Sequence, residues 1–258
     1  MILAALFCYI LTLWLVTIWV KKGYHILYRA SINPDVMQQF PEYSALILYA
    51  ENLTNGPSDE YSTSLLRRVE QEQRERLNPE DLQQQPHVHA WREAYRRFGS
   101  NPKKFPSSLE ALLKRVLKGN ELPAINRVVD IYNAISLEHL IPAGGEDWTK
   151  LASNLVLAVA TGTEPFVVFH EGQESVTYPD KGEIIWADAE GVTCRRWNWR
   201  QCKRTQLTEN TQHAYFVLDS LAPYTKEQLL AAGEGLAQHL HQVAPNCTIS
   251  TEILGALA

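Results

Sequence analysis

The sequence has few cysteines, and none of them lies in a paired motif. There is no C-x-x-C segment among the four cysteines, which stand at Cys8, Cys194, Cys202 and Cys247. Their spacing resembles neither a zinc ribbon nor a disulfide framework, so reduced thiols are expected. We therefore predict no metal site and no cofactor.

The sequence also lacks an excess of positive charge. Its 24 lysines and arginines are outnumbered by 29 acidic residues, which gives a net charge of −5 and a pI near 5.9. This balance excludes a generally basic nucleic-acid-binding protein, so any such contact must be a local patch. A length of 258 residues fits one large domain or two small ones.

Charge is entirely missing from the first twenty residues, MILAALFCYILTLWLVTIWV. At 1.5 Å per residue, such a helix spans about 30 Å, the thickness of the bilayer core. Lys21, Lys22 and Arg29 follow, so the pattern predicts an anchor in the cytoplasmic (inner) membrane with a cytoplasmic body. The alternative is that residues 1–20 are a leader added by an upstream start codon.

Beyond residue 30 the pattern indicates an α+β fold. Helical periodicity covers residues 62–82, 87–98 and 107–118, and capping boxes are predicted at Ser107 with Glu110 and at Thr225 with Gln228. We expect residues 21–90 to hold a first strand and a charged helical segment. Residues 91–222 should form the core, and residues 223–258 a helix and strand that complete it. The predicted strands are SALILYAENL, LVLAVA, FVVFH, EIIWA and AYFVLD.

Two runs bear on function. In NRVVDIYNAISLEHL, Asn126, Asp130 and Asn133 share one side of a helix and suit a ligand that both donates and accepts hydrogen bonds. The alternative is that Asn126 caps the helix and the others face water. The sequence PAGGED then predicts a tight loop, in which Gly144 and Gly145 let the backbone approach a ligand.

The second run, CRRWNWRQCKRT, alternates basic and aromatic residues. Arginine suits phosphate or carboxylate, and tryptophan offers a stacking face. In a strand, Arg196, Asn198 and Arg200 would face one way and the two tryptophans the other. The alternative is that the tryptophans are core and the arginines lie on an exposed face. Further basic residues, Lys103, Lys104 and Arg115, form a local positive surface or an ordinary solvated face.

The chain resembles the B3/B4 domain, the editing module of the phenylalanyl-tRNA synthetase beta subunit, and more closely its free-standing bacterial relatives. The resemblance rests on segments that occur in order: WREAYRRFG, PKKFPSSLEALLKRVLKG, LPAINRVVDIYNAISLEHLIPAGGED, GTEPF, GEIIWAD, CRRWNWRQCKRT and TQHAYFVLD. It implies helices packed against a central, mostly antiparallel sheet, with a cleft between them. It places the two runs on opposite walls of one pocket.

The resemblance implies hydrolysis in trans of the ester of a mischarged aminoacyl-tRNA, without ligase activity. Gly144 takes the place of a histidine of the synthetase, and RRWNWRQCKR replaces its glycine-rich segment. The alternative is a non-catalytic module that binds an amino acid or tRNA. The implied roles are catalytic for Asn126, Asn133, Gly144 and Gly145; substrate-binding for Asp130, Glu146, Arg196, Asn198 and Arg200; and tRNA-binding for Lys103, Lys104, Arg115, Arg195, Lys203 and Arg204.

Overall fold

The computed structural model describes residues 28–170 and 173–258 and has the predicted α+β fold. The apolar run at residues 1–20 lies outside these ranges, so the predicted anchor stays a prediction. Within residues 28–170 and 173–258, none of the helices has the length and apolar character needed to span a bilayer.

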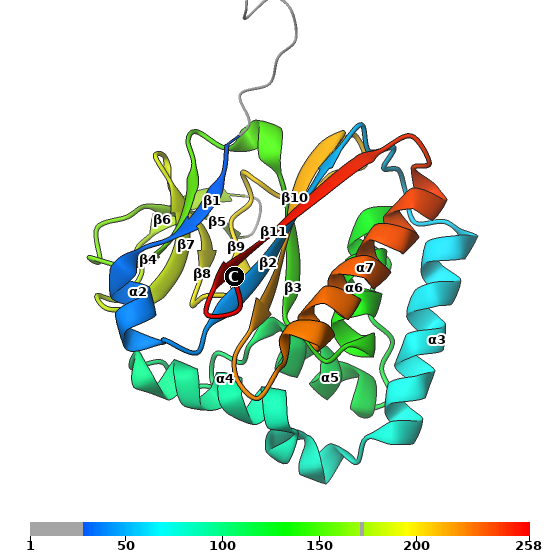
Figure 1. The fold of residues 1–258 in the computed structure, drawn as a ribbon, viewed down its shortest axis with the longest axis horizontal. Helices are drawn as coiled ribbons and strands as arrows, with labels where there is room; N and C mark the ends of the chain where they lie inside the picture. The colour runs from blue at the N-terminus through cyan, green and yellow to red at the C-terminus, as the bar shows by residue number, and fades with distance from the viewer. Residues whose placement is uncertain (1–27, 171–172) are drawn as a thin grey trace, which may run out of the picture.

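Two sheets lie face to face, where the sequence predicted one central sheet (Figure 1). The four-stranded sheet is antiparallel, in the order β11 (Thr248–Gly255), β2 (Ser44–Glu51), β10 (His213–Ser220) and β3 (Ala143–Asp147). The five-stranded sheet runs β1 (Ala30–Ile32), β4 (Leu155–Val159), β7 (Ile184–Asp188), β8 (Gly191–Arg195) and β9 (Arg200–Gln201); its one parallel pair is β1 with β4. β5 (Phe166–His170) and β6 (Gln173–Thr177) form a separate ribbon.

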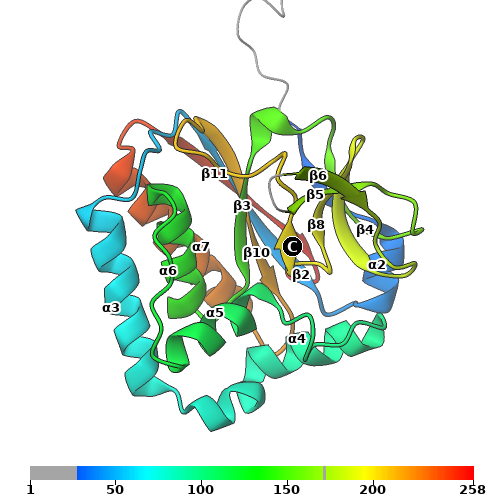
Figure 2. The same cartoon turned by 180° about the vertical axis from the view of Figure 1, so that it is seen from behind.

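Helices cover the outer face of the four-stranded sheet (Figure 2). α6 (Arg127–Glu138) and α7 (Lys226–Val243) pack on it, and α3 (Glu60–Arg76) and α5 (Ser108–Leu117) pack against α6. α4 (Pro86–Arg97) reaches both cores, and the short α2 (Pro34–Gln39) packs on β4. The described residues also form two 3₁₀ helices, at Pro79–Gln84 and Trp148–Lys150.

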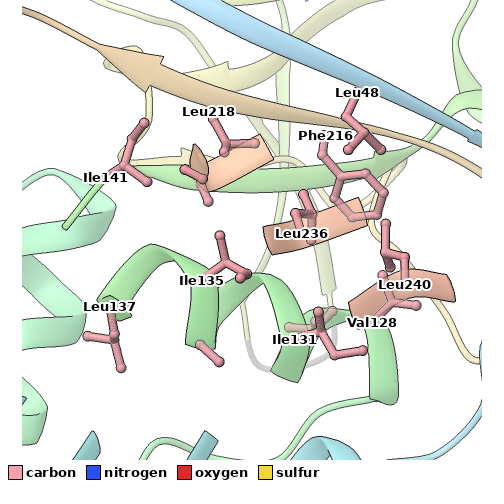
Figure 3. Packing of buried hydrophobic residues seen from close by; sticks show 14 of the residues in the cluster. Leu48, Val128, Ile131, Ile135, Leu137, Ile141, Phe216, Leu218, Leu236 and Leu240 are labelled. Carbon is pink, nitrogen blue, oxygen red and sulfur yellow. The ribbon is translucent and has the colours of Figure 1, made fainter. Parts of the chain in front are cut away.

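Alternation along the strands creates a separate core on each face of the four-stranded sheet. On β10, Phe216 and Leu218 face the helices, where they meet Ile131, Ile135 and Leu236 (Figure 3). The intervening side chains of β10 face the five-stranded sheet, in a second core rich in aromatic rings. There, the Trp197 ring lies 4.8 Å from Phe40 and 5.2 Å from Trp91, centroid to centroid.

The predicted strands LVLAVA, FVVFH, EIIWA and AYFVLD are confirmed as β4, β5, β7 and β10. The capping box of Thr225 and Gln228 is also confirmed, at the start of α7. Ser107 caps α5 as predicted, but Glu110 does not complete the box. Its carboxylate instead pairs with the Arg92 guanidinium at 2.6 Å and the Lys114 ammonium at 2.7 Å.

The predicted tight loop at PAGGED is wrong, because these residues form the edge strand β3. Its glycines are explained by packing. A β-carbon on Gly145 would lie 2.7 Å from the Phe216 ring and 3.0 Å from Leu207, too close for either to accommodate it. Gly145 therefore faces the helical core, and its neighbours Gly144 and Glu146 face the five-stranded sheet.

Candidate functional site

A small cavity of about 30 Å³ lies between the two sheets. The four-stranded sheet contributes Gly144 and Glu146 from β3 and Tyr215, Val217 and Asp219 from β10. The other wall comes from β7, β8, β9 and the turn between the last two: Trp186, Cys194, Trp197, Asn198 and Gln201. The cavity is large enough for about two water-sized groups.

Glu146 is the carboxyl group at one end of the cavity. It is only 3% exposed and accepts a hydrogen bond from the Thr205 hydroxyl. Burial raises its pKa to about 7, although the neighbouring Thr205 and Tyr215 hydroxyls oppose the shift. Because this pKa lies near neutrality, the carboxyl can hold or release a proton under ordinary conditions.

Asp219 is the second carboxyl group. The Tyr43 hydroxyl donates to its Oδ1 at 2.6 Å, and the Asn198 Nδ2 donates to its Oδ2 at 3.1 Å. Burial raises the pKa of Asp219 to about 7 despite these two donors. The cavity therefore holds two acids that are partly protonated at neutral pH.

Several donors around the cavity make no hydrogen bond of normal geometry within the described part of the chain. The Trp186 indole N–H is buried without an acceptor there, and that of Trp197 lies near the Tyr43 hydroxyl and lowers its pKa without a hydrogen bond of normal geometry. The hydroxyls of Tyr215 and Thr193 lie near Glu146 and lower its pKa, but neither makes a hydrogen bond of normal geometry. An indole N–H can only donate, so a group that fills this cavity has to offer an acceptor. Buried unpaired donors of this kind are costly and uncommon in folded proteins.

The buried thiol beside these groups is not a nucleophile. Burial raises the pKa of Cys194 well above its usual value, and Glu146 and Asp219 raise it further. A protonated thiol is a poor nucleophile. Within the two described ranges, no group of three or more histidine, cysteine, aspartate or glutamate side chains could hold a metal ion.

The second run holds a turn, so the alternation considered for a strand does not apply to it. Arg196 and Trp197 have φ values of 44° and 67°, in the left-handed region, and residues 196–199 connect β8 to β9. The turn breaks the predicted alternation: Trp197 enters the core, and Asn198 lines the cavity. Left-handed backbone at residues other than glycine costs on the order of 1 kcal/mol each, which the burial of Trp197 offsets.

The predicted amide stripe lies elsewhere. Asn126 caps α6 by accepting from the Val129 N–H at 3.1 Å, which is the alternative considered from sequence. Asp130 is buried and accepts from the Ser62 hydroxyl at 3.1 Å and the Ile125 N–H at 2.9 Å. Asn133 is half-buried on the same helix. None of the three lines the cavity, so the expected opposite walls of one pocket are not formed by these two runs.

Of the nine residues predicted to be catalytic or substrate-binding, the cavity brings together Gly144, Glu146 and Asn198. The carbonyl of Gly145 accepts from Gln201 Nε2 at 3.0 Å, although its Cα faces the helices. The sequence reasoning missed Asp219. An aspartate at the end of the apolar strand AYFVLD, two residues from Val217, was the available signal, because strand alternation turns both inward.

The predicted tRNA-binding residues divide into paired and unpaired groups. Arg195 makes a two-pronged contact with Glu183, at 2.9 and 2.7 Å, and Arg204 pairs with Asp188 at 2.7 Å. Arg115 donates to the Glu121 carbonyl at 2.7 Å. By contrast, no ion pair within the described ranges engages four exposed residues, Lys103, Lys104, Arg200 and Lys203. The second group is the one that keeps its charge available to a ligand.

A family model described as the B3/4 domain matches residues 90–236, more than half of the chain. The protein belongs to the B3/4 domain family. The match to this B3/4 chain contains most of α4, all of α5 and α6, and every strand that lines the cavity. It therefore confirms the resemblance to the B3/B4 domain that the sequence motifs indicated.

A solved structure similar to this B3/4 chain is an N-terminal fragment of the phenylalanyl-tRNA synthetase beta subunit from Pyrococcus horikoshii. The two are 11% identical with a TM-score of 0.44, and the alignment covers 90% of this chain and 52% of the other. The chain thus spans about half the length of that fragment. A search of curated proteins found no significant match.

Proposed function

We propose that this B3/4 chain acts in tRNA-linked quality control by hydrolysing, in trans, the ester of a mischarged aminoacyl-tRNA. The observation that carries the proposal is the cavity between the sheets. It contains two buried carboxyl groups with pKa values of about 7 beside the Trp186 indole N–H, which has no hydrogen-bond acceptor among the described residues. A proton acceptor next to spare donors is the arrangement that hydrolysis of an activated ester requires.

In the proposed reaction, water attacks the carbonyl carbon of the ester. Glu146, when ionised, takes a proton from that water. The bond from the carbonyl carbon to the ribose oxygen breaks, and the ribose oxygen takes up the proton. The products are a free amino acid and an uncharged tRNA. Because an aminoacyl ester is already activated, the reaction needs no serine or cysteine nucleophile.

The other cavity groups hold the reacting atoms. The Trp186 indole N–H has no acceptor within the described ranges, and the carbonyl oxygen gains negative charge as water adds. Asp219, when ionised, suits the α-ammonium group, and Asn198 holds Asp219 in place at 3.1 Å. Asn126 and Asp130 act at a distance in this scheme, by fixing the start of α6 behind β3.

The second candidate is a non-catalytic module that binds an amino acid or tRNA. The size of the cavity favours it, since about 30 Å³ admits the polar end of an amino acid but not a whole side chain. In the hydrolytic scheme the amino-acid side chain must therefore lie outside the cavity. Both candidates place the body of the protein in the cytoplasm, with tRNA.

A panel of mischarged tRNAs separates the two candidates. The full-length protein should release the amino acid from at least one of them faster than buffer does, and Glu146→Gln should abolish the gain. If no charged tRNA is hydrolysed but free amino acid or tRNA binds, the non-catalytic candidate replaces the enzyme. Exposed His89→Gln serves as a control that should hydrolyse normally.

A further inference from the structure

We propose that Phe105 and Trp199, with Lys103, Lys104 and Arg200, form a docking platform for the single-stranded 3′ end of a nucleic acid. We call these five residues the aromatic platform. The inference deepens the proposed function, and the identification of the ligand as the 3′ end of a tRNA rests on it. The platform itself rests on geometry outside the cavity.

The first observation is a fixed pair of aromatic rings at the surface. The Phe105 and Trp199 rings are half-buried and meet edge to face, with centroids 4.8 Å apart. Backbone contacts hold their segments together, because the Ser108 N–H donates to the Asn198 carbonyl at 3.1 Å. Rings that are rigid and partly open offer a base a stacking surface at little cost in conformational entropy.

The second observation is the buried guanidinium beneath the rings. The Arg196 Cζ lies 3.7 Å from the Phe105 centroid and 4.8 Å from that of Trp199, and its Nη2 pairs with Asp180 at 3.0 Å. Its Nη1 is buried and makes no hydrogen bond to any described residue. This cation contacts both rings and holds them in place, while Asp180 and Glu183, at 3.0 and 3.6 Å from its Nη2, balance its charge.

The third observation is unpaired positive charge around the rings. The Lys104 ammonium lies 5.0 Å from the Phe105 centroid, and the Arg200 Cζ lies 5.9 Å from that of Trp199. Lys103 adjoins Lys104 in sequence, and no carboxylate of residues 28–170 or 173–258 pairs with Lys103, Lys104 or Arg200. Three cations without carboxylate partners there, two of them over the rings, form the local patch that a phosphate backbone requires on a chain with a net charge of −5.

Position links the platform to the cavity. The turn at residues 196–199 presents Trp199 to the platform, while Trp197 and Asn198 line the cavity. A nucleotide stacked on Trp199 would therefore lie one turn away from the groups assigned to the ester. Interleaved rings and cations of this kind bind single strands, whose bases are free to stack, in preference to duplexes.

The test uses the full-length protein and a fluorescently labelled single-stranded RNA with the sequence of a tRNA 3′ end. Anisotropy should show binding that weakens as salt rises. Trp199→Ala should weaken it about 5- to 100-fold, as expected for one lost stacked base, and Trp199→Phe should keep most of it. The double change Lys103→Gln, Lys104→Gln should reduce the salt slope by about 1.4. Lys226→Gln, at the start of α7 outside the platform, should change neither.

Three results would overturn the platform: equal affinity for a duplex of the same sequence, competition by polyglutamate as strong as by RNA, or unchanged binding by Trp199→Ala. Circular dichroism confirms that each variant is folded. The platform and the hydrolysis can fail separately. RNA binding that depends on Trp199 without any hydrolysis removes the enzyme and keeps the platform. If the protein hydrolyses a mischarged tRNA and Trp199→Ala leaves RNA binding unchanged, the enzyme is kept and the platform is removed.

Discussion

At the residue scale, Glu146 shows how a carboxyl group can be kept near its point of ionisation. It is surrounded by buried side chains, and hydroxyl groups are its nearest polar neighbours. No cation of the described residues forms an ion pair with it and Arg204 opposes the shift only weakly, so burial dominates and its pKa rises from 4.5 to about 7. The unfolded chain releases this proton at a lower pH than the folded protein does. Ionisation of Glu146 therefore lowers the free energy of unfolding.

Glu146→Gln should stabilise the protein at pH 8 while removing hydrolysis. The folded pKa is raised, so the free energy of unfolding falls as pH rises from about 4.5 to about 7 and then levels off. The shift corresponds to at most about 3 kcal/mol. Urea denaturation at pH 4.5 and pH 8 measures the effect. The variant should match the wild type at the lower pH and exceed it at the higher. A variant less stable at pH 8 would show that ionised Glu146 makes stabilising contacts.

At the element scale, two adjacent glycines of β3 have different roles, because they face opposite sides of the sheet. Gly145 makes room for Phe216 in the helical core, where an added β-carbon would clash at 2.7 Å. Gly144 faces the cavity, where the nearest atom to an added β-carbon is Gln201 Nε2 at 3.3 Å, the movable end of a side chain. One strand thus serves packing on one face and the proposed chemistry on the other.

Gly145→Ala and Gly144→Ala therefore form a matched pair. We expect Gly145→Ala to lower the free energy of unfolding by about 1–3 kcal/mol, as is typical of an overpacked core. Gly144→Ala should cost less than 1 kcal/mol or so but reduce hydrolysis, because the new methyl group crowds the cavity. Thermal melts and deacylation rates of both variants test this. The reverse order of stabilities would contradict the assignment of faces.

His87 ties three elements together and should make the fold sensitive to acid. Its Nε2 accepts from the Trp91 indole N–H at 3.1 Å and from the Leu221 N–H at 3.2 Å, while Nδ1 donates to the Leu140 carbonyl at 2.8 Å. A proton added at Nε2 would face two donors. Burial lowers the pKa of His87 to about 4, so its contribution to stability is complete above pH 6.5 and is lost as pH falls toward 4.

Urea denaturation between pH 7 and pH 4 tests this contribution. His87→Gln should be less stable at pH 7, by about 1–3 kcal/mol, because hydrogen bonds are lost. It should also lose less stability on acidification than the wild type does. The control is His89→Gln in the same helix, where the side chain is exposed and should leave the pH profile unchanged. If the free energy of unfolding falls equally with pH for His87→Gln and the wild type, His87 is not the source of the acid sensitivity.

At the scale of the whole molecule, the four-stranded sheet is shared by both cores. Adjacent residues of β2, Ile47 and Leu48, are fully buried on opposite faces of it. Neither core can separate without exposing one face of this sheet. We therefore expect one cooperative unfolding transition for residues 28–258, as is usual for a compact domain.

Leu48→Ala and Ile47→Ala should each cost about 2–5 kcal/mol and shift every probe together. Four of the five described tryptophans, Trp91, Trp148, Trp186 and Trp197, lie in the core between the sheets, whereas most helices lie on the other face. Fluorescence and far-ultraviolet circular dichroism therefore report on different faces. Leu48→Ala changes only the helical face, so coincident shifts of both midpoints would support one unit. Midpoints that separate would show that the two cores unfold independently.

Much of this fold follows from local patterns in the sequence, but the site does not. Strands such as AYFVLD and the cap at Thr225 depend on neighbouring residues, so alternation and capping rules predict them. The cavity depends on which strands become neighbours. Asp219 and Asn198 lie 21 residues apart and meet only because two sheets stack. The turn at Arg196 and Trp197 was missed because neither residue favours left-handed backbone, and the burial of Trp197 overrides that local preference.

Because their pKa values are about 7, the two buried acids also hold protons in part of the molecules at neutral pH. A ligand whose binding requires both carboxylates to be ionised must expel the protons held by Glu146 and Asp219 into the surrounding solution. The buffer then absorbs those protons with its own heat of ionisation. Calorimetry of the same ligand in two buffers of different ionisation heat would therefore give two different apparent enthalpies, and the difference would count the protons that leave the cavity.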